Sequence, residues 1–264
     1  MTNTVVFTAP LDVTSPLNRV PKVTIDFWLI KLMAVTMGET AADYLNVNLG
    51  IGLTNTSLIM TAVLIVALIL QFRQKRYVPW SYWLAVVLIS VVGTLVTDNL
   101  VDNFGVPLIV TAVGFTLTLA ATFALWYWAE GTLSIHSIRT TRREAWYWLA
   151  ILFTFALGTA AGDLVAEKFG LGYLSTGILF GMIIASLSVG YFFLGLDAIL
   201  GFWLAYILTR PLGASFGDLL SQDRQFGGFG LGTVITSAVF LSAIILIVAW
   251  MTLTRDGEES ATLA

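Results

Sequence analysis

Four aspartates recur at one position of an internal sequence repeat, and a carboxylate can bind a cation or carry a proton. Each follows a glycine by five residues and a tryptophan by fifteen, within an otherwise apolar stretch. The four are Asp43, Asp98, Asp163 and Asp218. A charged side chain costs about 2.5–3.5 kcal/mol at the centre of a bilayer, although much less near its surface. Asn or Ser could equally cap a helix end, so four aspartates at one position favour a role for the charge itself.

Oxygen-bearing side chains accompany the aspartates. The residue four positions earlier shares a helix face with the aspartate, and it is Glu39, Thr94 or Thr159 in the first three copies. A threonine at a similar expected depth follows in the second half of each copy, and these are Thr56, Thr111, Thr176 and Thr236. Carboxylate and hydroxyl oxygens suit hard cations such as Na⁺, Mg²⁺ and Mn²⁺, and carboxylates also carry protons. The aspartates, Glu39 and the second-half threonines therefore form the predicted cation or proton site.

Three ionisable residues break the repeat inside apolar stretches, because Lys31, Glu39 and Arg210 have no counterpart in the other copies. Ionisable residues in such places usually pair with one another or line a pathway. We expect Lys31 and Arg210 to be charge partners of the acidic residues, with Arg210 facing Asp218 or a neighbouring aspartate. Two further roles stay open, namely a change of partners during a transport cycle and the binding of a small solute's carboxylate.

The repeat reads [FY]-W-x9-G-x4-D, a short link, and then G-[IVL]-[GP]-x3-T, with spacings of 55, 65 and 55 residues between its four copies. The two halves are offset by 120 residues, and the last copy has a five-residue insertion within 221–228. Another small residue follows the first glycine by four positions, which favours close helix packing at Gly38, Gly93, Gly158 and Gly213. The tryptophans are interpreted as membrane-interface anchors, and they are Trp28, Trp83, Trp148 and Trp203.

The composition predicts an all-α integral membrane protein. Apolar residues make up 58% of the 264 residues and charged residues 11%, against about 25% charged in typical soluble proteins. The mean hydropathy is +0.88. Eight windows are long and apolar enough to span a bilayer: 24–47, 53–72, 80–101, 106–130, 144–166, 171–194, 197–220 and 230–253. Each repeat holds two of them, so we expect eight transmembrane helices built from four parallel two-helix repeats.

The expected organisation is one transmembrane domain between two short tails. The domain covers 24–254, with repeats at about 24–73, 79–138, 144–195 and 196–254. The tails are 1–23, which lacks the features of a signal peptide, and 255–264. Nine basic residues lie on the side of the membrane where the tails are expected, and two lie on the other side. The remaining two, Lys31 and Arg210, lie within predicted spans. The positive-inside rule then places both termini in the cytoplasm of a multi-pass protein of a bacterial inner (plasma) membrane.

Several functional classes are disfavoured. The chain has no cysteine and one histidine, His136, so thiolate chemistry and imidazole clusters are excluded. We find no catalytic triad, no phosphate-binding loop, no soluble domain large enough for catalysis and no basic surface for nucleic acid. We therefore expect no enzyme activity and no cofactor apart from a bound hard cation. The expected partners are the lipid bilayer and a small ion or solute, and homo-oligomerisation is left open.

Nearly the whole chain, about 22–254, resembles a family of bacterial inner-membrane proteins with four tandem copies of a two-helix repeat of unknown function. The matching stretches are KVTIDFWLIK…MGETAADYL, YWLAVVLISVVGTLVTDN, YWLAILFTFALGTAAGDL and LTRPLGASFGDLL. The resemblance implies an integral membrane protein and brings no activity with it.

The residues favour a transport protein for a hard cation, with Mn²⁺ as an example and proton or Na⁺ coupling as a variant. Two alternatives come from other classes. In one, the chain is a membrane scaffold or partner subunit with structural aspartates. In the other, it is a small-solute carrier that uses Arg210 and Lys31. The cation transporter and the scaffold differ in where the aspartates should lie, since a cation site requires the carboxylates to converge, whereas a scaffold would leave them at separate helix ends.

Overall fold

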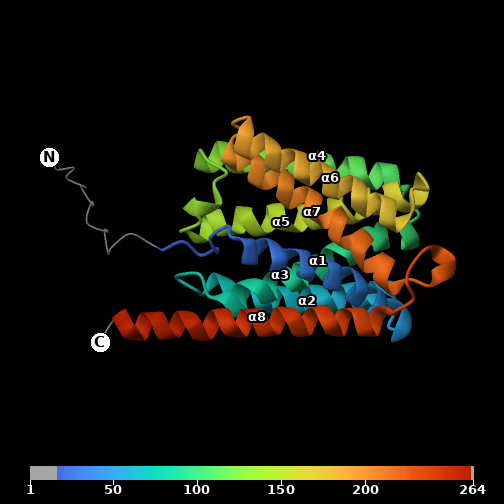
Figure 1. Cartoon of the computed structure of the whole chain (residues 1–264), viewed down its shortest axis with the longest axis horizontal. Helices are drawn as coiled ribbons and strands as arrows, with labels where there is room; N and C mark the ends of the chain where they lie inside the picture. Colours follow the sequence, from blue (N-terminus) through green and yellow to red (C-terminus); the bar gives the residue numbers. More distant parts are fainter. Residues whose placement is uncertain (1–16, 263–264) are drawn as a thin grey trace.

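The computed structural model describes residues 17–262, with side chains up to residue 254, and this part of the chain is all-helical. Eight long helices lie along one common direction (Figure 1), where the eight apolar windows were expected. They are α1 (Ile25–Asp43), α2 (Leu53–Phe72), α3 (Pro79–Asp98), α4 (Leu108–Glu130), α5 (Thr141–Asp163), α6 (Gly172–Phe193), α7 (Ala198–Ser221) and α8 (Thr233–Thr262). Several begin at recognisable signals. For example, Thr24 and Thr140 accept bonds from backbone N–H groups at the starts of α1 and α5.

Three of the four odd-numbered helices change from α-helix to π-helix directly after the repeated aspartate. After Asp43, Asp98 and Asp163 the chain continues for five residues as a π-helix: η1 (Tyr44–Asn48), η2 (Asn99–Asn103) and η4 (Leu164–Lys168). None of these aspartates caps the following turn with its side chain. In the fourth copy α7 stays α-helical to Ser221, and a loop with the 3-10 helix η5 (Arg224–Phe226) follows. Short π-helices are rare and occur often at functional sites.

The odd-numbered helices form a closed ring, which we call the inner ring (α1, α3, α5 and α7). Within it α1 contacts α3, α3 contacts α5, α5 contacts α7, and α7 contacts α1 again. The even helices lie outside and pack on the next repeat, with α2 on α3, α4 on α5, α6 on α7 and α8 on α1. At most 22% of the apolar window is buried in α2, α4, α6 and α8, against 50–67% in α3, α5 and α7. The four repeats are therefore parallel and related around one axis.

Four glycines allow the ring to close. Each receives the side chain that stands three positions before the glycine of the neighbouring repeat. A Cβ atom added to them would lie 2.4 Å from Ser90 Cβ at Gly38, 2.7 Å from Phe155 Cβ at Gly93, 2.4 Å from Arg210 Cβ at Gly158 and 2.9 Å from Val35 Cβ at Gly213. Because real Cβ atoms do not approach this closely, each of these positions requires a glycine. The same helix contact is thus repeated four times around the axis.

The Gly93→Ala variant should unfold more easily than the wild-type chain. Its new methyl group meets Phe155 Cβ and backbone atoms of α5, which cannot move aside as the end of a flexible side chain could. Overpacking of this kind costs about 1–3 kcal/mol. Gly114→Ala on α4 is the matched control, since nothing lies within 4 Å of its added Cβ and alanine favours the helix. Thermal unfolding in detergent measures the difference, and equal melting temperatures would contradict the close contact.

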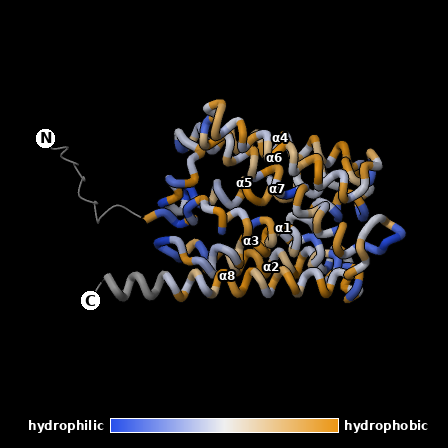
Figure 2. Tube along the Cα trace, in the orientation of Figure 1, coloured by the Kyte–Doolittle hydropathy of each residue, from blue (hydrophilic) through white to orange (hydrophobic). Residues whose placement is uncertain are grey.

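Seven of the helices in the described range are long and apolar enough to cross a membrane. The eighth, α1, fails this criterion because it carries Asp26, Lys31, Glu39 and Asp43. The tube coloured by hydropathy shows hydrophilic segments gathered at the two ends of the helices and apolar segments between them (Figure 2). Most of the α1 polar residues lie within the inner ring, where Lys31 and Glu39 are 0% and 6% exposed.

The two chain ends depart from the expected tails. Of the N-terminal segment 1–23 only residues 17–23 are described, and they pack against the helix connections. There Val20 is buried, and Arg19 forms an ion pair of 2.8 Å with Glu144 and donates its backbone N–H to Ile138. At the other end α8 stays helical to Thr262, so 255–262 continues the helix instead of forming a separate tail. Both described ends lie at the same end of the molecule (Figure 1).

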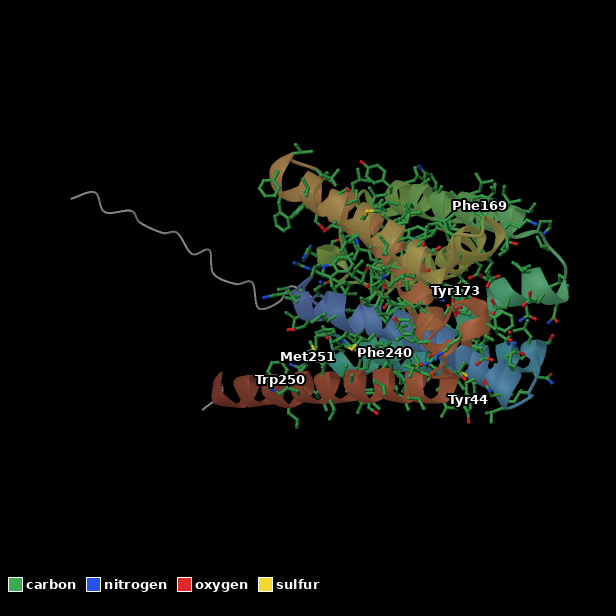
Figure 3. All side chains as sticks on the ribbon, turned by 45° about the vertical axis from the view of Figure 1, so that its right-hand side comes forward. Tyr44, Phe169, Tyr173, Phe240, Trp250 and Met251 are labelled. Carbon is green, nitrogen blue, oxygen red and sulfur yellow. The ribbon has the colours of Figure 1, made fainter. Side chains whose placement is uncertain are left out.

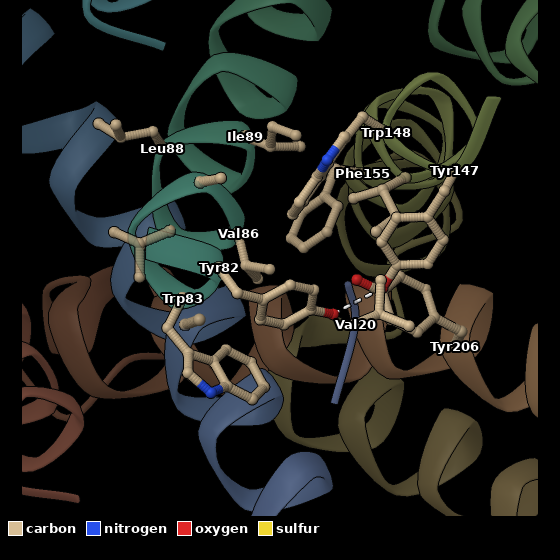
Figure 4. Packing of buried hydrophobic residues seen from close by; sticks show 14 of the residues in the cluster. Val20, Tyr82, Trp83, Val86, Leu88, Ile89, Tyr147, Trp148, Phe155 and Tyr206 are labelled. Carbon is tan, nitrogen blue, oxygen red and sulfur yellow. Dashed lines mark hydrogen bonds between the residues drawn. The ribbon is translucent and has the colours of Figure 1, made fainter. Parts of the chain in front are cut away.

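Three of the four repeated tryptophans are buried inside the protein, whereas the fourth, Trp28, is partly exposed. Trp83, Trp148 and Trp203 are at most 4% exposed, and each indole N–H finds a protein acceptor: Tyr77 Oη, Glu144 Oε1 and Leu133 O. Their rings contact a buried tyrosine pair, Tyr82 and Tyr147. The hydroxyls of this pair are 2.5 Å apart, and Figure 4 shows the pair with Trp83 and Trp148. Other tryptophans are exposed near the helix ends on the side of the termini, and these are Trp80, Trp128 and Trp250. Figure 3 shows Trp250 on α8.

Candidate cation site

Three carboxylates from three helices of the inner ring converge. Glu39 on α1, Asp163 on α5 and Asp218 on α7 each offer one oxygen, and these oxygens lie within 4.8 Å of one another. We call them the acidic triad. Glu39 and Asp218 are 6% and 9% exposed, and Asp163 is partly buried. Among the described residues no donor bonds the carboxylate of Asp163 or Asp218. The ring therefore places two repeated aspartates together with the one glutamate that breaks the repeat.

Arg210 lies across the inner ring directly beside the triad. Its Nη2 donates to Glu39 Oε2 at 2.8 Å and to Thr159 Oγ1 at 2.7 Å, and it also bonds Thr94 Oγ1. Thr94 in turn donates to Glu39 Oε2 at 3.1 Å. Glu39, Thr94 and Thr159 occupy the same position in three repeats, and the fourth repeat has Ala214 there. Arg210, which is completely buried, thus binds the equivalent residue of every other repeat and closes the axis of the ring.

The partner of Arg210 differs from the expected one. We predicted Asp218 or a neighbouring aspartate, whereas the ion pair forms with Glu39 on α1. The reason is the ring geometry: the side chain of Arg210 lies against Gly158 and reaches across the axis instead of running along its own helix. Its Nε and Nη1 are buried without a partner. With all groups ionised, the triad and Arg210 together carry a formal charge of −2.

The other two repeated aspartates are outside the triad. Gln222 Nε2 donates to Asp43 Oδ2 at 3.3 Å, so the loop with the insertion holds this carboxylate. Asp98 on α3 is partly buried and is not part of the convergent group. Of the four repeated aspartates, the structure thus brings two together with Glu39. Gln222 was not anticipated, because it lies in the insertion, where the repeat pattern gives no guidance.

The second-half threonines are buried but bond no carboxylate in the described part of the chain. Thr111 and Thr236 donate to the carbonyl oxygens of Pro107 and Gly232, one turn earlier in their helices. The hydroxyl oxygens of Thr56 and Thr176 are buried without a hydrogen-bond partner. The structure therefore gives these threonines no contact with the triad.

Lys31 is also completely buried, and it does not pair with Glu39. Its Nζ donates to Tyr206 O at 2.7 Å and bonds Thr209 Oγ1. It lies 4.0 Å from the centroid of the Tyr206 ring, a cation–π distance. Glu39 is two helical turns further along α1, where its carboxylate accepts a hydrogen bond from Arg210. Thr209 was not predicted from the sequence, because a single threonine beside Arg210 is not distinguished by the repeat pattern.

The repeat is recognisable beyond this chain. A family model described as Repeat of Unknown Function (DUF347) matches four consecutive stretches, residues 27–77, 81–132, 146–195 and 201–256. The chain belongs to this family. Each DUF347 stretch covers one inner-ring helix and the outer helix that follows it, so the unit of the family is the two-helix repeat. Searches of curated proteins and of solved structures returned no match.

Proposed function

We propose that the chain is a multi-pass membrane transport protein that binds a hard divalent cation, of which Mn²⁺ is an example, at the acidic triad. The observation that carries this proposal is the convergence of three carboxylate oxygens within 4.8 Å. Carboxylates kept so close together in a largely buried place repel one another unless a cation or protons neutralise them. A divalent cation balances the −2 charge of the triad and Arg210, and hard cations prefer oxygen ligands.

The membrane topology follows from the same arrangement. The outer helices expose apolar side chains along their length, as a lipid-facing surface requires. The charges of α1 that exclude it from the seven apolar spans lie mostly inside the ring, so α1 serves as an eighth span shielded from lipid. The excess of basic residues at the end with the termini supports a cytoplasmic location for that end in an inner membrane. The triad then faces the outer side.

Transport requires that the closed axis opens, and α7 has a local weakness there. Pro211 follows Arg210 inside α7 and removes one backbone hydrogen bond of the helix. Proline within a helix is a common cause of a bend. Bending of α7 at this place would withdraw Arg210 from Glu39 and leave the carboxylate to the cation. None of the other repeats has a proline at the equivalent position.

Mn²⁺ uptake into liposomes that contain the purified chain tests the proposal. We expect uptake well above that of protein-free liposomes and dependence on the acidic triad. The alternative is a scaffold whose buried polar groups only hold the helices together, and the Arg210–Glu39 pair favours it. A scaffold gives no uptake and no protection from thermal unfolding by Mn²⁺, and its Asp→Asn variants are merely less stable.

A further inference from the structure

Lys31 is a buried cation without a carboxylate partner. Its Nζ contacts only a backbone carbonyl, a hydroxyl and aromatic rings among the described residues: Tyr206 O, Thr209 Oγ1, and the rings of Tyr206 and Phe155. The ammonium form in such a place is costly unless it is paired. Lysine can lose its proton, whereas the nearby Arg210 cannot. Lys31 is therefore the basic group on this axis that can change its charge.

The charged and titratable groups around Lys31 come from several helices. On α7 they are Tyr206 and Arg210, on α3 Tyr82, and on α5 Tyr147. Glu39 on α1 itself is bonded to Arg210. Up to residue 254, where its side chains are described, α8 also packs on α1 and has no titratable side chain. A second positive charge that enters the ring near Arg210 therefore acts on Lys31 without an intervening free carboxylate.

A groove gives Lys31 a route for its proton. It lies between α1, α6 and α7 beside the connection around Ser134–His136, has a volume of about 660 Å³, and includes Thr209 in its wall. Thr209 Oγ1 bonds Lys31 Nζ and donates to Tyr206 O at 2.9 Å, so one hydroxyl separates the lysine from the groove. The groove is on the side of the chain ends, whereas the triad is at the opposite end of the helices.

We propose that Lys31 releases a proton when a divalent cation binds the acidic triad and takes a proton up again when the cation leaves, which rests on the proposed function of the triad. When a divalent cation binds the triad, the N–H bond of the Lys31 ammonium breaks and its electron pair stays on Nζ. The proton passes to Thr209 Oγ1, whose own hydroxyl proton rotates away from Tyr206 O and is taken up by solvent water in the groove. The return of a proton by the same route restores the ammonium and favours release of the cation.

Isothermal titration of the purified full chain with Mn²⁺, in buffers of different ionisation enthalpy, counts the protons released per bound cation. Metal binding releases protons from groups that it displaces or repels. We expect Lys31→Met to release one proton fewer than the wild-type chain, and Lys22→Met, at an exposed lysine, to match the wild type.

The outcomes separate the two proposals. If the wild-type chain binds no Mn²⁺, both the proposed cation site and the proposed role of Lys31 are wrong. If Mn²⁺ binds and Lys31→Met releases as many protons as the wild type, only the proposed role of Lys31 is wrong. Loss of a buried, unpaired charge should not unfold the chain. Where the Met variant nevertheless fails to fold, Lys31→Arg carries the same test, because a guanidinium keeps its proton and the same deficit of one proton is expected.

Discussion

The Asp163→Asn and Asp218→Asn variants should each bind Mn²⁺ about 100-fold more weakly than the wild-type chain, a loss of ~2.8 kcal/mol. Each change removes one of three convergent carboxylates and lowers the negative charge of the site, while the side chain keeps its shape. Affinity for hard cations depends strongly on the number of charged ligands. Titration calorimetry in detergent measures the two affinities directly.

Asp102→Asn is the matched control for both variants. Asp102 lies in η2 at the same end of the helices, but it is exposed and outside the triad. A general effect of surface charge on Mn²⁺ would weaken binding to the same degree in all three variants. That result would contradict a site at the triad, whereas unchanged binding by Asp102→Asn would support it.

The Arg210→Gln variant should be strongly destabilised in the absence of a divalent cation and partly rescued by it. Removing one partner of a buried ion pair costs about 3–5 kcal/mol, because the other charge stays buried. Here the change also raises the formal charge of the site from −2 to −3. Bound Mn²⁺ would offset part of this cost, by about 2.7 kcal/mol at a concentration 100 times its Kd.

Thermal unfolding with and without Mn²⁺ tests the role of Arg210, and the double variant Glu39→Gln, Arg210→Gln sharpens it. The double variant removes both charges of the pair, so it should be more stable than Arg210→Gln alone in the absence of cation. Additive effects of the two single changes would show that the contact between Arg210 and Glu39 contributes nothing of its own. Equal stabilisation of the wild type and Arg210→Gln by Mn²⁺ would show that the charge of Arg210 does not affect cation binding.

The helices and their repeated arrangement could be predicted from the sequence, because the repeat and the hydropathy pattern extend over most of the chain. Trp83 and its equivalents marked the start of each inner helix, and the glycine ten residues later marked the helix contacts. The surroundings of these tryptophans were not accessible. The indole N–H groups of Trp83 and Trp203 bond Tyr77 and Leu133 on connections between helices, and that of Trp148 bonds Glu144 one turn earlier on α5. A repeat pattern cannot reveal such contacts between copies.

The candidate site was predictable in its members but not in its pairing. Repetition singled out the aspartates, and departure from the repeat singled out Glu39 and Arg210. Which of them meet depends on the stagger between α7 and α1, and on Gln222 of the insertion, which holds Asp43. The π-helices after the aspartates were also missed, because a five-residue change of helix type leaves no hydropathy signal.

Mn²⁺ uptake by liposomes that contain the Asp163→Asn variant, compared with the wild type and Asp102→Asn, tests the central claim most directly. All three proteins are first matched for amount and for folding by circular dichroism. Cation transport through the acidic triad predicts rapid uptake by the wild type and Asp102→Asn, and loss of uptake by Asp163→Asn. Equal uptake by all three, or uptake no faster than in protein-free liposomes, would contradict it.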